Sequence, residues 1–178
     1  MSANDDIRAA SANFYAALNS MAAGDAAPMS GAWAQGAEVS AQHPIGGRDE
    51  GYDTVIASFA KVAEIAGGGD IRLVDQKIDA GTDLAVETGI ETGTLVIAGH
   101  EASIQHRVTN VYRKTGGEWK LAHHHTDLSE AMLDVLKRLS EAARLPDLET
   151  VADGTSRPPH IQSEEHELFG ATRTREAD

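Results

Sequence analysis

Four long segments that read as β-strands follow one another in the second half of the chain, and they constrain its fold more than any other feature. These segments cover residues 70–79, 84–97, 101–114 and 118–127. Gly99-His100 and Thr115-Gly116-Gly117 separate consecutive segments, and short glycine-containing links of this kind join antiparallel strands as hairpins. The sequence therefore predicts an antiparallel sheet in which chain neighbours pair.

Helical patterns surround this predicted sheet. We expect helices at residues 5–23, 26–33, 53–66 and 129–144, and one further strand at 38–43. The first helix carries Ile7, Phe14 and Leu18 at helical spacing, which indicates one apolar face. Asp53 is placed to cap the third helix, and Gly67-Gly68-Gly69 is expected to end it. The sequence therefore predicts the α+β fold class.

The composition changes at Pro146. Residues 146–178 contain Pro158 and Pro159, many charges and one aromatic side chain, so they can bury little apolar surface. We therefore predict one domain over residues 1–145, followed by an acidic, proline-containing, flexible tail over 146–178.

The overall composition excludes several classes of partner. The formal net charge is −13, which disfavours nucleic acid as a partner because phosphate backbones attract clustered Lys and Arg. No apolar run approaches the length of a membrane span, so no membrane is expected as a partner. The first residues lack the basic-then-apolar order of a signal peptide, which predicts a cytoplasmic location. There is no cysteine, so thiolate chemistry is excluded.

Three consecutive histidines, His123 to His125, lie near the end of the last predicted strand. Neighbouring side chains of a strand point to opposite faces of its sheet. His123 and His125 therefore share one face, and His124 shares the other face with Thr126. The run places a titratable group on both sides of the sheet.

The order of elements and several segments resemble the nuclear-transport-factor-two-like superfamily. The similar segments are Phe14-Tyr15-Ala16-Ala17-Leu18, Ala37 to Arg48, Arg107 to Arg113, and His123 to Ser129. They look closest to SnoaL-like and ketosteroid-isomerase-like proteins and to the calmodulin-dependent kinase association domain. The resemblance implies a cone-shaped, strongly curved antiparallel sheet wrapped around three helices, with an apolar pocket inside. It also implies a homodimer that pairs through the sheet.

The resemblance assigns roles to three residues. His43 precedes Pro44-Ile45-Gly46, where ketosteroid isomerases carry their general base, and an imidazole there can also move a proton. Asn110 and Tyr15 match the two oxyanion donors of those enzymes. The alternatives are structural: His43 as a backbone partner at a turn, Asn110 as a partner of a neighbouring strand or helix end, and Tyr15 as a core residue.

The same alignment predicts which other side chains line the pocket. These substrate-binding candidates are His124, Thr126, His106, Val108, Tyr112, Trp33 and Phe59. His124 would act as a second acid or as a ligand anchor. The expected ligand is a small, largely apolar molecule that bears a carbonyl.

The histidine run has two further interpretations. His123, His125 and Asp127 share one strand face, and imidazole with carboxylate suits Zn or Fe. The alignment turns that face away from the pocket and toward a dimer partner, so we expect no metal and no cofactor. The run is also similar to the His-His-His-Ser-Ser signature of iota-class carbonic anhydrases, although Thr126-Asp127 replaces the two serines.

The sequence thus predicts a small-molecule-binding SnoaL-like protein. If it is an enzyme, we expect cofactor-independent acid–base chemistry of the isomerase, cyclase or dehydratase kind. The first alternative is a non-catalytic ligand-binding or dimerisation domain. A lower-ranked alternative is a lyase similar to the iota-class carbonic anhydrases.

Overall fold

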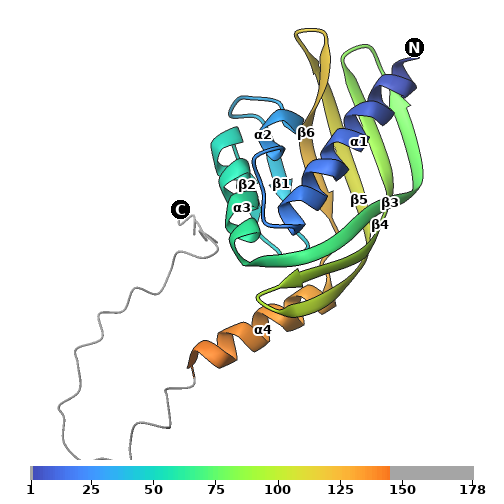
Figure 1. Ribbon diagram of the computed structural model, residues 1–178. Coiled ribbons are helices and arrows are strands. Elements are labelled where there is room, and N and C mark those ends of the chain that lie inside the picture. Colours follow the sequence, from blue (N-terminus) through green and yellow to red (C-terminus); the bar gives the residue numbers. More distant parts are fainter. Residues whose placement is uncertain (1, 145–178) are drawn as a thin grey trace, which may run out of the picture.

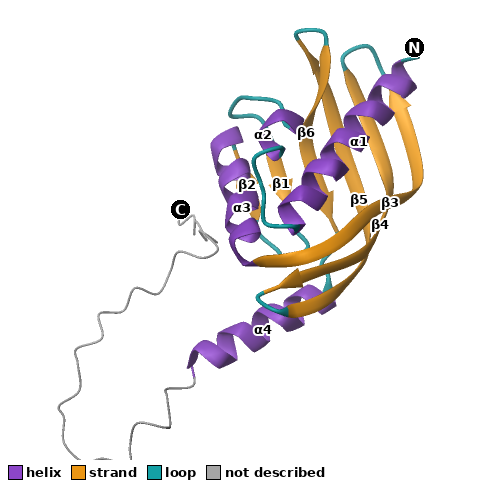
Figure 2. Ribbon diagram, viewed as in Figure 1, coloured by secondary structure: helices purple, strands orange, loops and turns teal. Residues whose placement is uncertain are grey.

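The computed structural model describes residues 2–144, which form four helices and six strands (Figure 1; Figure 2). The helices are α1 (Ala3–Ala22), α2 (Met29–Ala32), α3 (Tyr52–Ile65) and α4 (Glu130–Arg144). The strands are β1 (Ser40–Gln42), β2 (Arg48–Glu50), β3 (Ala66–Ala80), β4 (Leu84–Ile97), β5 (His100–Thr115) and β6 (Glu118–Thr126). The predicted tail, residues 146–178, lies outside the described residues.

The six strands form one sheet in the order β2-β1-β6-β5-β4-β3. The predicted hairpins are confirmed, because β3 with β4, β4 with β5, and β5 with β6 all pair antiparallel. The expectation of a wholly antiparallel sheet is wrong, because β1 runs parallel to β6. In the chain, β2, α3 and the strands β3 to β5 separate β1 from β6, and a long connection of this kind permits parallel pairing.

The sheet is open within the described residues, with β2 and β3 as its two edges. The strongly curved cone that the resemblance implies is therefore not what the structure shows. Two register shifts interrupt the β3–β4 ladder, between Ala66 and Gly69 and between Val74 and Lys77. Such bulges bend a strand locally, and β3 bends as it passes from the end of α3 toward the start of α1 (Figure 1).

Helix α1 lies across one face of the sheet, and α3 packs beside it (Figure 2). A capping box joins Ser2 and Asp5, which satisfies backbone donors at the start of α1. Ile7, Phe14 and Leu18 face the sheet and are buried, as their spacing predicts. Helix α4 contacts β5 at the other end of the sheet. One face of the sheet therefore carries the core.

The third helix differs from its predicted ends. It begins at Tyr52 after Gly51, which has φ of 86° and provides no side-chain cap, so the expected cap at Asp53 is wrong. It ends at Ile65, and the Gly67-Gly68-Gly69 run belongs to β3. Gly69 lies against the backbone of Thr94 in β4, an approach that only a residue without a side chain permits. None of the helices in residues 2–144 is long and apolar enough to cross a membrane.

Candidate functional site

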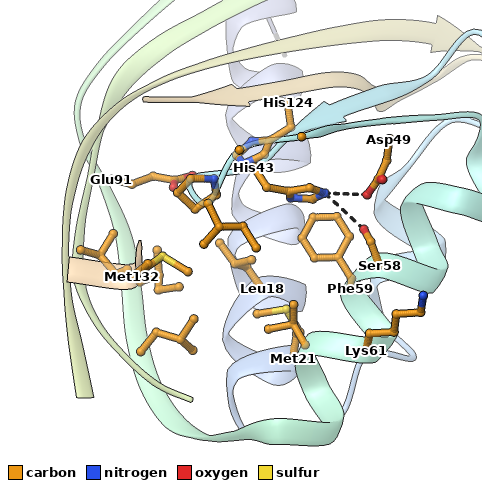
Figure 3. Close-up of a pocket in the computed structure, with 18 of the residues that line it drawn as sticks. Leu18, Met21, His43, Asp49, Ser58, Phe59, Lys61, Glu91, His124 and Met132 are labelled. Atoms are coloured by element: carbon orange, nitrogen blue, oxygen red, sulfur yellow. Dashed lines mark hydrogen bonds and ion pairs between the residues drawn. The ribbon is translucent and has the colours of Figure 1, made fainter. Parts of the chain in front are cut away.

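A cavity of about 620 Å³ lies between the helices and the inner face of the sheet (Figure 3). Most of its wall is apolar and includes Leu18, Met21, Phe59, Ile71, Ile104 and Met132. Two separate groups of polar side chains interrupt this wall. One group lies on β2, α3 and the turn that follows β1, and the other lies on the sheet.

His43 and Asp49 form the first polar group. Nε2 of His43 lies 2.8 Å from Oδ2 of Asp49, and both side chains are largely shielded from solvent. Ala41 pairs directly with Asp49 in the β1–β2 hairpin, and His43 lies two residues beyond Ala41 on the same face. Because a carboxylate only accepts, Nε2 of His43 carries the proton of this bond. Nδ1 has no hydrogen-bond partner within residues 2–144 and remains available as an acceptor.

Ser58 completes this group without forming a nucleophilic triad. Its Oγ lies 3.3 Å from Nε2 of His43, the same nitrogen that bonds Asp49, and it donates to the carbonyl oxygen of Val55 at 2.9 Å. In a Ser-His-Asp triad the serine and the carboxylate bond different ring nitrogens. The arrangement therefore favours proton transfer by His43 over nucleophilic attack by Ser58.

The second polar group centres on Glu91. Tyr15 donates to Oε1 of Glu91 at 2.9 Å, and Nε2 of His106 lies 2.8 Å from Oε2. Burial alone would raise the pKa of Glu91, but the bond from His106, the nearby imidazoles of His124 and His106 and the bond from Tyr15 together lower it. Burial beside Glu91 raises the pKa of the Tyr15 hydroxyl, which therefore stays protonated. Nδ1 of His106 is buried without a partner.

His124 lines the cavity beside this group, and its ring is oriented by hydrogen bonds within the sheet. Its Nδ1 lies 2.7 Å from Oδ1 of Asn110, and the amide nitrogen of Asn110 donates to Oε2 of Glu87 at 2.8 Å. The three residues form one cross-strand row, because Glu87 pairs with Asn110 and Asn110 pairs with His124. Burial lowers the pKa of His124 to about 4, so its ring is neutral at pH 7.

The structure brings four of the predicted site residues together at the cavity wall: His43, Phe59, His106 and His124. Six others do not line it: Asn110, Tyr15, Thr126, Val108, Tyr112 and Trp33. Tyr15 and Asn110 instead bond Glu91 and Glu87 inside the protein, and Tyr112 also donates to Glu87, at 3.1 Å. Trp33 packs against Phe14 and Phe59. Thr126 and Val108 pair across β5 and β6 and are buried.

Sequence reasoning missed Asp49, Ser58 and Glu91. A signal for Asp49 was present, because the turn at Pro44-Ile45-Gly46-Gly47 can fold the chain back so that Asp49 approaches His43. Glu91 carried a weaker signal, since it lies four residues from Glu87 and so on the same face of the strand.

The outward-facing histidines lie apart from the cavity. Nδ1 of His123 lies 2.8 Å from the hydroxyl of Ser40, and the rings of His123 and His125 are 6.0 Å apart. Asp127 is bonded by Arg107 at 2.7 and 3.1 Å, which lowers the pKa of the Asp127 carboxyl. Within residues 2–144, no group of three or more His, Asp or Glu residues is arranged to hold a metal ion.

The fold is similar to that of solved nuclear transport factor 2-like proteins. A candidate dehydratase of that family from Streptomyces avermitilis superposes with a TM-score of 0.62 at 24% identity, covering 72% of this chain and 97% of that one. A nuclear transport factor 2-like superfamily protein from Salmonella enterica superposes with a TM-score of 0.63 at 16% identity, covering 71% of this chain and 91% of that one. A candidate aromatic ring hydroxylase from Novosphingobium aromaticivorans superposes with a TM-score of 0.60 at 16% identity, covering 68% of this chain and 85% of that one. These likenesses establish the fold.

The family follows from the sequence as well. Residues 7–129 match the SnoaL-like domain, so the chain belongs to the SnoaL-like family. No curated protein matches the chain in sequence. The resemblance drawn from the sequence is thereby confirmed at the level of family and fold.

Proposed function

We propose that this protein binds a small, largely apolar, carbonyl-bearing molecule in the cavity and transforms it by cofactor-independent acid–base chemistry. The reaction class is that of an isomerase, cyclase or dehydratase. One observation carries the proposal: two histidine–carboxylate pairs, His43–Asp49 and His106–Glu91, face the same largely apolar cavity. Polar groups placed in an otherwise apolar pocket are typical of sites that orient and transform a ligand.

His43 is the proposed base. Its Nε2 proton bonds Asp49, so its Nδ1 lone pair can remove a proton from carbon next to a carbonyl. Asp49 holds the ring in one tautomer and stabilises the imidazolium that forms, which is the role of a carboxylate behind a catalytic histidine. The edge of the His43 ring packs on Phe59, with ring centres 5.6 Å apart, and this contact fixes its orientation.

The His106–Glu91 pair is the proposed second polar centre. Both side chains are almost fully buried, and their bond is supported by Tyr15. His106 and Glu91 bond each other and both line the cavity, so the pair presents a polar edge to a bound ligand. A ligand that reaches both centres would be held between the base and this second site.

The test begins with a native mass spectrum of the purified protein at neutral pH, which identifies any co-purified organic molecule. Turnover and binding of that molecule, or of compounds of its class, are then compared in His43→Ala and in the matched control His125→Ala. His125 lies on the opposite face of the sheet and is exposed. We expect loss of turnover with retained binding in His43→Ala, and no change in His125→Ala.

Two other outcomes would change the assignment. Binding that persists with no turnover in the unaltered protein would favour a non-catalytic ligand-binding domain. Carbon dioxide hydration above background would favour the carbonic-anhydrase-like alternative.

We also propose that two copies pair through the outer face of the sheet. That face carries the partly exposed apolar side chains Val74 and Val86, and His123 and His125 lie on it as well. An outward apolar face on a sheet is a frequent site of association. Sedimentation equilibrium would give twice the chain mass if this is correct, and Val86→Lys would shift the mass toward one chain.

A further inference from the structure

A chain of hydrogen bonds runs from the protein surface to the cavity through five residues of five elements. Its members are Arg8 of α1, Gln76 of β3, Glu87 of β4, Asn110 of β5 and His124 of β6. The links measure 2.6, 2.6, 2.8 and 2.7 Å in that order. Each link has a donor and an acceptor, so the direction of one link constrains the next.

The direction is set at the surface. A guanidinium can only donate, so NH1 of Arg8 bonds the amide oxygen of Gln76. The amide nitrogen of Gln76 therefore faces Glu87 and donates to its Oε1. The other oxygen of Glu87 receives donors from Asn110 and Tyr112. Glu87 is fully buried, and donors from its neighbours reach both of its oxygens.

The orientation of Asn110 follows, and a second contact supports it. The amide nitrogen of Asn110 faces Glu87 and also lies 3.4 Å from the Tyr15 hydroxyl, whose own proton bonds Glu91. Two independent acceptors therefore require nitrogen, not oxygen, on this side of the amide. Its oxygen then faces His124, and Nδ1 of His124 must carry the proton.

We propose that His124 presents Nε2 to the cavity as a hydrogen-bond acceptor, and that the ligand bears a hydroxyl group that donates to it. The inference rests on the proposed ligand-binding function and names a second chemical feature of the ligand besides its carbonyl. His124 is the ligand anchor, and Asn110 and Glu87 are positioning residues that fix its tautomer. A carbonyl oxygen at this point would face the lone pair of His124 Nε2 and could not form a hydrogen bond with it. The site therefore favours a hydroxyl over a carbonyl.

The electrostatic surroundings keep the acceptor in place. Burial lowers the pKa of His124 to about 4, and protonation of His43, His106 or His123 would act in the same direction. Glu91 opposes them. At neutral pH the ring is therefore uncharged, with one protonated and one unprotonated nitrogen.

The first measurement is the tautomer of His124 in the full-length protein. A long-range ¹H–¹⁵N spectrum of ¹⁵N-histidine-labelled protein at pH 7 separates protonated from unprotonated ring nitrogens. The signals of His124 are assigned by their loss in His124→Gln. We expect a protonated Nδ1 and an unprotonated Nε2. A protonated Nε2 on His124 would overturn the inference.

The second measurement uses three probes that share one skeleton: indane, 1-indanone and 1-indanol. Indane has no polar atom, the carbonyl of 1-indanone only accepts hydrogen bonds, and the hydroxyl of 1-indanol both accepts and donates them. We expect 1-indanol to bind about tenfold more tightly than 1-indanone, which corresponds to about 1.4 kcal/mol. Addition of 1-indanol should also shift the Nε2 signal of His124.

The same probes separate failure of this inference from failure of the proposed function. Equal affinity for all three probes would overturn the hydroxyl anchor and leave the apolar cavity as a binding site. No binding of any probe would overturn both proposals. In Asn110→Leu, which removes the acceptor for Nδ1, the preference for 1-indanol should disappear while indane still binds. The tautomer and the probe series in the unaltered protein remain decisive even if that variant fails to fold.

Discussion

Asn110 and His124 lie directly opposite each other on β5 and β6, and their side chains bond at 2.7 Å. The resemblance to ketosteroid isomerases assigns Asn110 as a donor to the ligand. In the structure the amide nitrogen of Asn110 is bonded to Glu87, and its oxygen is bonded to His124. Asn110 therefore acts on the cavity through His124, and the histidine is the residue that faces the ligand.

The buried neutral state of His124 predicts acid-sensitive stability. The pKa of His124 is lowered from 6.5 to about 4 on folding, chiefly by burial, so the unfolded chain binds the proton more readily. The stability that depends on the neutral ring is fully present above pH 6.5 and is lost as the pH falls toward 4. From His124 alone, we expect the free energy of unfolding to be about 2 kcal/mol lower at pH 5 than at pH 7.5.

Urea unfolding of the full chain at several pH values measures this loss. His124→Gln should remove most of the loss between pH 7.5 and pH 5, because an amide does not titrate. Restricting the range to pH 5 and above keeps the buried carboxylate of Glu91 ionised, since its pKa is below the usual value. A pH dependence that persists unchanged in His124→Gln would show that other groups cause it.

The fold was largely predictable because its strongest signals are local. Glycine-containing turns fixed the hairpins between β4, β5 and β6, and helical spacing identified α1. The parallel pairing of β1 with β6 was not predictable in this way. Ser40 pairs with His123, 83 residues away, and no local turn specifies such a contact.

The polar interior was harder to predict because β4 inverts the usual alternation. Val86 and Ile90 lie on its outer face, whereas Glu87 and Glu91 are buried on the inner face. Apolar side chains normally mark the core face of a strand, so the pattern alone places both carboxylates in solvent. Only the donors supplied by other strands and by α1, such as Tyr15, make their burial tolerable.

Replacement of Asp49 tests how His43 is held. Asp49→Asn can place an amide N–H against Nε2 of His43, which would force the proton onto Nδ1 and remove the proposed base. We expect turnover of the ligand class identified by native mass spectrometry to fall about a hundredfold, with binding nearly unchanged. Asp70→Asn is the matched control, because Asp70 pairs with Arg72 on the exposed surface. A similar decrease in both variants would contradict the role of Asp49.

Gly93 is predicted to tolerate no side chain. Its φ is 140°, and an added Cβ would overlap the carbonyl oxygen of Asp70 in the neighbouring strand β3. Gly93→Ala should lower the free energy of unfolding by about 3 kcal/mol or more, through backbone strain and overlap together. Gly31→Ala is the control, since a Cβ at Gly31 meets no atom within 4 Å. Chemical denaturation of the two variants should separate them clearly, and equal stability would contradict the close approach of β3 and β4.

Helix α4 is predicted to form part of the binding cavity through one of its faces. Met132 and Leu136 line the cavity, whereas the neighbouring Leu133 is 36% exposed. Met132→Ala should lower the free energy of unfolding by about 2 kcal/mol and weaken the binding of indane, because it removes buried apolar contact at the wall. Leu133→Ala, on the same helix and of similar size, should change stability by about 0.5 kcal/mol or less and leave indane affinity unchanged. Titration with indane and urea unfolding give both quantities. Equal effects of the two substitutions would mean that α4 does not present this face to the ligand.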